Sequence, residues 1–289
     1  MARDTRSIGH RVLAVRDVEV PTFLYGTAWK EDRTEGLVRQ ALAAGFRGLD
    51  TANQPRHYHE AGVGRALAGA FEDGTLSRED VFVQTKFTHV AGQDHRMPYD
   101  PRVPVAEQVA QSFRSSLEHL GVERIDSYVL HGPSRRVGLA DADREVWRAM
   151  EAIHDGGGTR LLGISNVTAE QVEGLYDFAR VKPAFVQNRC FARTGWDAGV
   201  RRVCAARDVV YQGFSLLTAN PEAIGHPVVR EIAGRHRATV PQIVFAFALA
   251  IGIVPLTGTT DPRHMAEDLG VYELGLTDQE VREIETLSA

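Results

Sequence analysis

The sequence predicts an α/β protein, a (β/α)8 TIM barrel with an N-terminal β-hairpin cap. Short apolar runs rich in β-branched residues alternate with longer helical patterns along most of the 289 residues, which favours a closed parallel sheet. The length also fits, because barrels commonly run to about 250 residues as one domain. Since no stretch rich in proline, glycine or serine divides the chain, we expect one barrel domain over residues 1–289. An open doubly wound sheet is the alternative.

The expected elements alternate strictly after the hairpin. Strands are predicted at Thr22–Ala28, Phe46–Thr51, Val81–Phe87, Ile125–His131, Arg160–Ser165, Ala184–Cys190, Val209–Ser215 and Ile253–Leu256. Helices are predicted at Thr34–Ala44, Gly62–Phe71, Val105–Leu120, Asp143–His154, Thr168–Arg180, Asp197–Ala206, Pro227–Arg237, Pro241–Ala250, Pro262–Leu269 and Thr277–Leu287. Gly45 and Gly121 stand where a helix C-cap favours glycine, and Thr168 with Gln171 is typical of a capping box.

Composition argues against several classes of function. The formal net charge is -5 and no run of Lys or Arg stands out, so we expect no nucleic-acid partner. Cys190 and Cys204 are too few for a secreted disulfide framework and favour a reducing compartment. Residues 1–20 lack a signal-peptide core and the apolar stretch at 244–255 is too short for a membrane span, so we expect a cytoplasmic protein without a membrane partner. HExxH and Cys-x-x-Cys patterns are absent, and no metal site is expected.

Polar residues stand at the C-terminal ends of several predicted strands, which meet at one mouth of a barrel. Asp50, Lys86 and His131 end three successive strands, and this acid and lysine can pair. A lysine beside a phenol lowers the pKa of the phenol, which then becomes a usable proton donor near neutral pH. Further polar residues at or after strand ends are Ser165, Asn166, Gln187, Ser215, Thr257 and Thr259.

The glycine pattern argues against a Rossmann-type nucleotide site. Neither Gly62-Val63-Gly64 nor Gly156-Gly157-Gly158 belongs to a strand–GxGxxG–helix unit, and no GxxxxGK(S/T) loop occurs. We expect any bound nucleotide to be held by the barrel loops.

Five segments carry motifs that match one family in order. They are Gly48–Ala52 with Tyr58–Gly64, Phe82–Lys86, Ile125–Pro133, Gly163–Val167 and Val186–Asn188. Together they resemble the motifs of the aldo-keto reductase family, and the resemblance runs from Gly26–Lys30 to Glu267–Leu269. It implies a barrel that binds NADP(H) and reversibly reduces aldehydes or ketones.

The resemblance also implies roles for individual residues. Tyr58 is the general acid that protonates the developing alkoxide, and His131 donates a hydrogen bond to the substrate carbonyl. Lys86, paired with Asp50, lowers the pKa of Tyr58. The implied cofactor-binding residues are Ser165, Asn166, Gln187, Phe214, Ser215, Leu217, Thr259, Arg263, His264, Glu267 and Asp268, and the implied substrate-binding residues are Trp29 and His57.

The sequence departs from the family pattern between the acid and the tyrosine. Counting forward from Asp50 by the usual spacing ends on Pro55, whereas counting backward from Glu60 ends on His57. The inserted residues 54–57 shift the register, and Tyr58 is the only tyrosine nearby. We expect Tyr58 to be the general acid because the chemistry needs a phenol; a structural Tyr58 in an inactive relative is the alternative.

A second departure lies where the family binds the 2′-phosphate of its cofactor. Gly258 takes the place of the family's lysine and Thr259 that of its serine. His264 stands at the arginine position with Arg263 beside it, so fewer fixed charges remain for a phosphate. NADP(H) is the expected cofactor, with NAD(H) as the alternative; Glu267 and Asp268 match the positions that contact adenine.

Two other functions use the same residues. Lys86 could form a Schiff base in an aldolase-type barrel, or the chain could be a non-catalytic regulatory subunit that keeps the cofactor as a ligand. We expect a small-molecule carbonyl or alcohol as the partner, and a monomer or weak homo-oligomer. The loop 88–104 after the third strand is expected to line the substrate pocket or to be a solvated loop.

Overall fold

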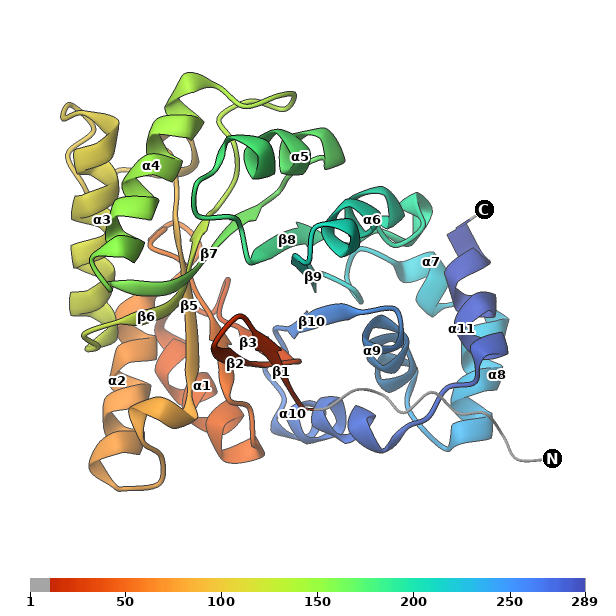
Figure 1. Ribbon diagram of the computed structural model, residues 1–289. Coiled ribbons are helices and arrows are strands. Elements are labelled where there is room, and N and C mark those ends of the chain that lie inside the picture. The colour runs from red at the N-terminus through yellow and green to blue at the C-terminus, as the bar shows by residue number, and fades with distance from the viewer. Residues whose placement is uncertain (1–10, 289) are drawn as a thin grey trace.

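The computed structural model describes residues 11–288, and its centre is a closed barrel of eight parallel strands (Figure 1). The barrel strands are β3 (Leu24–Gly26), β4 (Gly48–Asp50), β5 (Phe82–Phe87), β6 (Ile125–Leu130), β7 (Thr159–Ser165), β8 (Phe185–Arg189), β9 (Val210–Phe214) and β10 (Ile253–Thr257). They pair in sequence order, and β10 closes the barrel by pairing with both β9 and β3. The predicted fold class is therefore confirmed.

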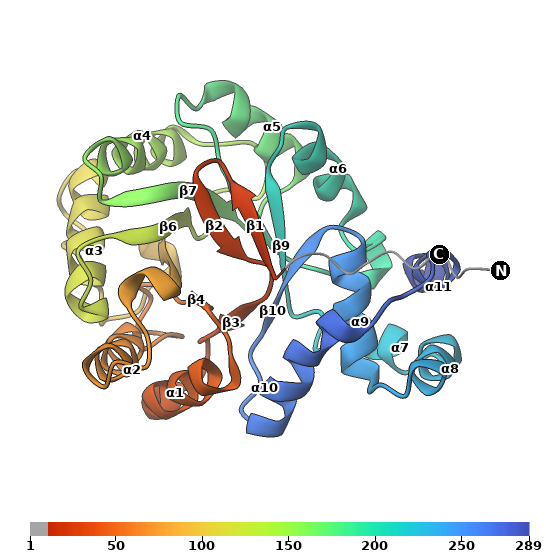
Figure 2. The same ribbon diagram turned by 60° about the horizontal axis from the view of Figure 1, so that its bottom comes forward.

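An antiparallel hairpin covers the N-terminal end of the barrel, as predicted. It consists of β1 (Val12–Val15) and β2 (Val18–Pro21), and it lies across the barrel opening in Figure 2. Val15, Val18 and Val20 are buried in one apolar cluster with barrel residues such as Leu24 and Phe82. The hairpin closes this end because its apolar face removes these barrel side chains from water.

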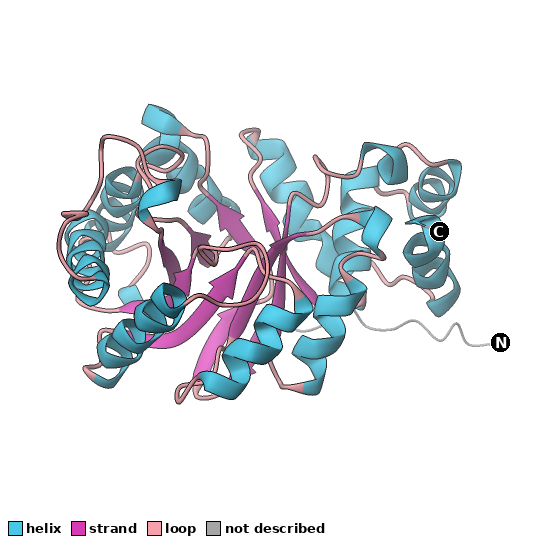
Figure 3. Cartoon of the chain, turned by 90° about the horizontal axis from the view of Figure 1, so that it is seen from above, coloured by secondary structure: helices cyan, strands magenta, loops and turns pink. Residues whose placement is uncertain are grey.

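Helices surround the barrel (Figure 3). They are α1 (Thr34–Ala44), α2 (Glu60–Glu72), α3 (Val105–Leu120), α4 (Asp141–Asp155), α5 (Ala169–Phe178), α6 (Ala198–Ala206), α7 (Pro221–Ile224), α8 (Pro227–His236), α9 (Val240–Ala250), α10 (Pro262–Leu269) and α11 (Asp278–Glu285). The ends of α1 and α3 match the sequence prediction because Gly45 and Gly121 adopt the left-handed backbone of a C-cap. No helix within residues 11–288 is long and apolar enough to cross a membrane.

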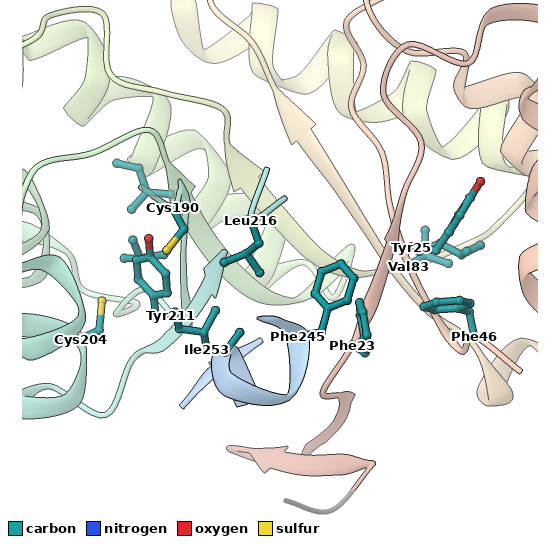
Figure 4. Packing of buried hydrophobic residues seen from close by; sticks show 14 of the residues in the cluster. Phe23, Tyr25, Phe46, Val83, Cys190, Cys204, Tyr211, Leu216, Phe245 and Ile253 are labelled. Atoms are coloured by element: carbon teal, nitrogen blue, oxygen red, sulfur yellow. The ribbon is translucent and has the colours of Figure 1, made fainter. Parts of the chain in front are cut away.

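Two regions of the fold pack apolar side chains. Most of the core lies between the barrel and its helices, and Figure 4 shows two parts of it: Phe23, Tyr25 and Phe46 in one, Tyr211 and Ile253 in the other. The second region is the barrel interior next to the hairpin. The barrel interior at its N-terminal end is therefore lined by apolar side chains, which we call the apolar floor.

The barrel interior changes from apolar to charged along β5. On β5 the alternation of side chains places Phe82, Gln84 and Lys86 on the inner face, one layer above another. Phe82 belongs to the apolar floor, and Lys86 lies at the C-terminal mouth. Two expected strands are shorter than predicted, because only residues 24–26 and 48–50 pair with barrel neighbours. The short β4 ends at Asp50 and so delivers this side chain to the mouth.

Candidate functional site

Asp50 and Lys86 form a buried ion pair at the C-terminal mouth of the barrel. The Nζ of Lys86 donates hydrogen bonds of 2.7 Å to Oδ1 and 2.7 Å to Oδ2 of Asp50. A third bond of 2.8 Å reaches the carbonyl of Thr51. Lys86 is fully buried and Asp50 is 3% exposed. Burial lowers the pKa of Lys86, while the charge of Asp50 acts against this effect. The three acceptors and the lack of solvent access disfavour Lys86 as a Schiff-base lysine.

Tyr58 lies at this ion pair despite the inserted residues that precede it. The Nζ of Lys86 is 5.3 Å from the centre of the Tyr58 ring, and the rings of Tyr58 and His131 are 5.9 Å apart in an edge-on arrangement. The insertion forms a turn in which the Gln54 carbonyl accepts bonds from the backbone N–H groups of His57 and Tyr58. The structure therefore brings Asp50, Tyr58, Lys86 and His131 together.

The pKa of Tyr58 moves in the opposite direction from the one that the sequence predicted. Burial raises it above its ordinary value, and the negative charge of Asp50 raises it further. Lys86 does not reverse this effect, because its ammonium is already paired with Asp50. The expectation that the pKa of Tyr58 lies below its ordinary value is corrected accordingly, because burial and the Asp50 carboxylate outweigh any effect of the Lys86 ammonium. The phenol is held in its protonated, donor form at neutral pH.

His131 is a neutral imidazole fixed by a neighbour that the sequence did not single out. Burial, followed by the charge of Lys86, lowers the pKa of His131 to about 3. The Nδ1 of His131 shares a 2.7 Å hydrogen bond with the hydroxyl of Thr88, the first residue after β5. Because Thr88 is buried, this bond restricts the orientation of the imidazole ring.

Ser165, Asn166 and Gln187 form one hydrogen-bonded group beside His131. The carbonyl of Gln187 accepts bonds from the Ser165 hydroxyl at 2.6 Å and the Asn166 N–H at 3.0 Å. The Nδ2 of Asn166 donates to the His131 carbonyl at 2.7 Å. Asn166 adopts a left-handed backbone, φ 56°, which asparagine tolerates better than most residues. The Nε2 of Gln187 points into the barrel, where it donates to Asp50.

Trp29 and His57 stack on each other at the edge of the site. Their rings are 4.0 Å apart, and the N–H of Trp29 donates to the His57 carbonyl. The Nδ1 of His57 is 2.9 Å from Oε1 of Gln54, and burial lowers the pKa of His57. A cleft of about 500 Å³ is lined by these rings, by Tyr58 and by Arg96 of the loop 88–104. A larger cavity of about 610 Å³ lies at α6 and β9, and none of the four catalytic candidates lines it.

Residues at the end of β9 and just after it reach the surface, as a ligand-binding role requires. Phe214 and Leu217 are half-buried, and the guanidinium of Arg189 lies 6.0 Å from the centre of the Phe214 ring. Ser215 has a left-handed backbone, φ 58°. Such a backbone costs free energy in a non-glycine residue and is found more often at binding sites than elsewhere.

A lysine from another loop lies where Gly258 replaces the family's lysine. The Nζ of Lys30 donates a 2.6 Å hydrogen bond to the Gly258 carbonyl, and a Cβ at Gly258 would be 3.7 Å from this Nζ. Burial lowers the pKa of Lys30 to about 8. Tyr25 donates to the nearby Thr259 carbonyl at 2.9 Å. No sequence motif points to Lys30 here, because 228 residues separate it from Gly258.

The other residues expected near the cofactor's phosphate and adenine differ in accessibility. Arg263 and His264 are exposed, and Arg263 forms a 2.8 Å ion pair with Asp261. Glu267 is half-buried. Asp268 is only 3% exposed; its Oδ2 accepts a 2.7 Å bond from the Thr257 hydroxyl, and burial raises its pKa to about 6. The adenine contact of Asp268 stays a prediction; in this structure its carboxylate holds Thr257.

Two glutamines in the barrel interior belong to the same site and were also missed. Gln84 and Gln212 are fully buried, and Gln84 donates to Asp50. The strand alternation places Gln84 on the same face as Lys86, a signal that was present in the sequence. Within the described chain no three His, Cys, Asp or Glu side chains lie close enough to hold a metal ion.

Comparisons with known proteins agree with this geometry. The sequence model described as "Aldo/keto reductase family" matches residues 23–220. The chain is 31% identical over 259 residues to an aldo-keto reductase of Mycobacterium ulcerans (strain Agy99), across 89% of this chain and 83% of that protein. It is 28% identical over 273 residues to "Uncharacterized oxidoreductase YtbE" of Bacillus subtilis (strain 168), across 94% and 90%. The structure of Bombyx mori aldo-keto reductase in complex with NADP has a TM-score of 0.80 and 23% identity, and the match covers 95% of this chain and 91% of that one.

Proposed function

This chain belongs to the aldo/keto reductase family, and from that premise we propose that it reduces aldehydes or ketones to alcohols with NADPH, with Tyr58 as the general acid. One observation carries the proposal: the buried Lys86–Asp50 pair lies beside Tyr58 and His131 at a single barrel mouth. An arrangement that combines a neutral phenol, a neutral imidazole and a buried ammonium can donate two hydrogen bonds to a carbonyl oxygen and stabilise the charge that develops there.

Tyr58 supplies the proton in this proposal. Its raised pKa keeps the phenol protonated at neutral pH, so a proton is available when the carbonyl oxygen becomes an alkoxide. The Lys86 ammonium, 5.3 Å from the ring centre, attracts the negative charge that remains on the phenolate. Because the Lys86 ammonium is itself bound to Asp50, it stays in place during the proton transfer.

His131 orients the carbonyl through its second ring nitrogen. A neutral imidazole has one N–H, and a hydroxyl donor at Nδ1 leaves that N–H on Nε2. We infer that Thr88 donates to Nδ1 and that Nε2 donates to the substrate oxygen. This tautomer allows His131 to act without a charge, in agreement with its pKa of about 3.

The chain offers suitable groups for a nicotinamide cofactor. When bound, NADPH supplies the hydride. The Oε1 of Gln187 accepts no hydrogen bond from any residue within 11–288, so it remains available to the amide of a carboxamide, with Ser165 and Asn166 beside it. Phe214 would stack on the nicotinamide ring, and Ser215 with Leu217 would contact the pyrophosphate.

Lys30 supports NADP(H) over NAD(H) as the preferred cofactor. Gly258 has no side chain to keep a phosphate away from the ammonium of Lys30, which is 3% exposed and donates to the Gly258 carbonyl. Thr259, Arg263, His264 and Glu267 would complete this end of the cofactor site.

The cleft beside Trp29, His57 and Tyr58 would hold the carbonyl substrate. We propose that residues 1–289 act as one barrel domain, as a monomer or weak homo-oligomer. The two unpaired cysteines, Cys190 and Cys204, support a reducing, cytoplasmic location.

The test is consumption of NADPH, followed by its absorbance, in the presence of a panel of aldehydes and ketones, with NADH measured in parallel. Turnover of at least one carbonyl, with the alcohol identified by mass spectrometry, supports the proposal. Tight NADPH binding without turnover of any compound would favour the non-catalytic regulatory subunit.

A further inference from the structure

Three glutamine side chains form a hydrogen-bonded cluster inside the barrel, one layer below Lys86. Gln187 on β8 and Gln212 on β9 are register partners on neighbouring strands, whereas Gln84 lies on β5, on the opposite side of the barrel. Gln84 and Gln212 are 0% exposed and Gln187 is 3% exposed. We call these three residues the glutamine layer.

The glutamine layer is bonded directly to Asp50. The Nε2 of Gln84 donates to Oδ1 of Asp50 at 2.8 Å, and the Nε2 of Gln187 donates to the same oxygen at 2.9 Å. Lys86 donates to it as well, so a single carboxylate oxygen accepts three hydrogen bonds. Charge-assisted bonds of this kind are stronger than bonds between neutral groups.

Gln212 ties the other two glutamines together from below. Its Oε1 accepts from Gln84 at 2.8 Å and from Gln187 at 3.0 Å. Its Nε2 donates in return to Oε1 of Gln84 at 3.2 Å. Gln212 therefore reaches Asp50 only through its two neighbours, and the cluster fixes the direction in which both amide nitrogens point.

Packing alone does not account for this cluster. The layer directly below contains apolar side chains such as Phe82 and Phe185, which fill the barrel without polar atoms. Burying an amide costs free energy unless its hydrogen bonds are made, and an apolar side chain of similar volume avoids that cost. The bonds of the glutamine layer converge on one functional group, the carboxylate that holds Lys86.

We propose that Gln84 and Gln212 are positioning residues that fix the Asp50 carboxylate, and through it Lys86, in the geometry that the Tyr58 proton transfer requires. The inference rests on the proposed reductase function. Gln84 acts on Asp50 directly, and Gln212 acts by holding Gln84 and Gln187. Without Gln84, Oδ1 of Asp50 keeps only the bonds from Lys86 and Gln187, and without Gln212 the amides of Gln84 and Gln187 lose the acceptor that orients them. In both cases the ion pair is freer to turn away from Tyr58. The Asp50 charge also becomes less dispersed, which raises the pKa of Tyr58 further.

The test uses Gln84→Met and Gln212→Met, which keep the side-chain length and remove the amide. We expect kcat for carbonyl reduction to fall by about tenfold or more in each variant, the loss that follows from one misplaced charge-assisted bond. The KM for NADPH should stay within about twofold in Gln84→Met, because Gln84 forms hydrogen bonds with Asp50 and Gln212 and none with Gln187, the proposed carboxamide-binding residue. In the alcohol-oxidation direction, where the phenol must lose its proton, the rise of the rate with pH should be displaced to higher pH.

Ser127→Ala is the matched control. Ser127 on β6 is fully buried and lies beside Gln84 in the strand register, but its hydroxyl has no hydrogen-bond partner in the described chain. Its removal should leave kcat and the pH profile unchanged. If Gln84→Met fails to fold, Gln212→Met still tests the inference, because Gln212 forms no hydrogen bond with Asp50.

A double-mutant cycle with Asp50→Asn separates positioning from general damage to the barrel. If the glutamines act through Asp50, adding Gln84→Met or Gln212→Met to Asp50→Asn should change kcat by less than about twofold. Two results would overturn the inference: effects on kcat that are fully additive in the cycle, or single variants with the kcat and pH profile of the wild type. In either case, carbonyl turnover by the wild type would still support the reductase function. A wild type that reduces no carbonyl overturns both.

Discussion

The Nζ of Lys86 lies 2.7 Å from each carboxylate oxygen of Asp50, and neither side chain has appreciable access to water. Removing one member of such a pair leaves a buried charge without its partner, which destabilises a protein by about 3–5 kcal/mol. We therefore expect Lys86→Met to lower the free energy of unfolding by that amount in urea titrations and to abolish carbonyl reduction.

The double variant Asp50→Asn with Lys86→Met separates the two effects. Since it removes both charges, it should recover at least half of the stability that Lys86→Met loses, while activity stays absent. If the double variant lost as much unfolding free energy as the two single variants together, a direct coupling between these residues would be contradicted.

The lowered pKa of His131 predicts a pH-dependent contribution to stability. In the unfolded chain a histidine titrates near about 6.5, whereas His131 in the fold titrates at about 3. Between these values the unfolded chain binds a proton that the folded site rejects. The contribution of His131 is therefore complete above pH ~6.5 and is lost as the pH falls towards 3.

The variant His131→Gln removes this titration. The loss of unfolding free energy between pH ~7 and ~5 should be smaller in the variant than in the wild type by about 1–2 kcal/mol. Identical pH dependence in the two proteins would mean that His131 takes up its proton in the folded state as an ordinary histidine does.

Lys30 predicts a pH dependence of cofactor binding. Because burial lowers its pKa to about 8, the ammonium loses its charge as the pH rises through this value. The Kd of NADPH, measured by fluorescence quenching, should be constant near neutral pH and should increase above pH ~8. In Lys30→Met we expect binding about tenfold weaker at neutral pH, without this increase.

Lys182→Met is a control for a general loss of positive charge, because Lys182 donates to the Tyr176 carbonyl outside the site. A wild-type Kd that does not change between pH 7 and 9.5 (roughly one and a half units above the Lys30 pKa) would show that the cofactor does not depend on this ammonium.

Gly64 tests the packing that places α2 against α3. A Cβ at Gly64 would lie 2.0 Å from the backbone carbonyl of His119, a contact that side-chain motion cannot relieve. Gly64→Ala should lower the free energy of unfolding by about 3 kcal/mol. A Cβ at Gly36 in α1 would have no atom of the described chain within 4 Å beyond its own chain neighbours and helix backbone. Gly36→Ala should instead stabilise the fold by about 0.5–1 kcal/mol. Equal effects of the two substitutions would contradict the close approach.

Most elements of the fold are predictable from local patterns in the sequence. Helices α1, α3 and α10 begin and end as predicted, since capping glycines and a leading proline mark their ends. Short apolar runs rich in β-branched residues identify the strands. The alternation of side chains along a strand places Gln84 on the same face as Lys86, although only the closed barrel brings it to Gln212, 128 residues away.

Properties that depend on distances in the folded chain were not predictable from the sequence. The direction of the Tyr58 pKa depends on burial and on the position of Asp50, neither of which a motif specifies. The contact of Lys30 with Gly258 joins two barrel loops. The hydrogen bond from Thr257 to the carboxylate of Asp268 joins the end of β10 to α10, and no motif in the sequence indicates it.

Tyr58→Phe tests the central claim most directly. This substitution removes only the phenolic oxygen, so NADPH binding should be unchanged while kcat for carbonyl reduction falls by about 10²–10⁴-fold, the usual contribution of a general acid. Tyr128→Phe is the control, because its hydroxyl is buried on β6 with Ser112 of α3, and none of the four proposed catalytic residues, as its polar neighbour, and it should retain wild-type kcat. A Tyr58→Phe enzyme that reduces carbonyls at the wild-type rate would contradict the assignment of Tyr58 as the proton donor.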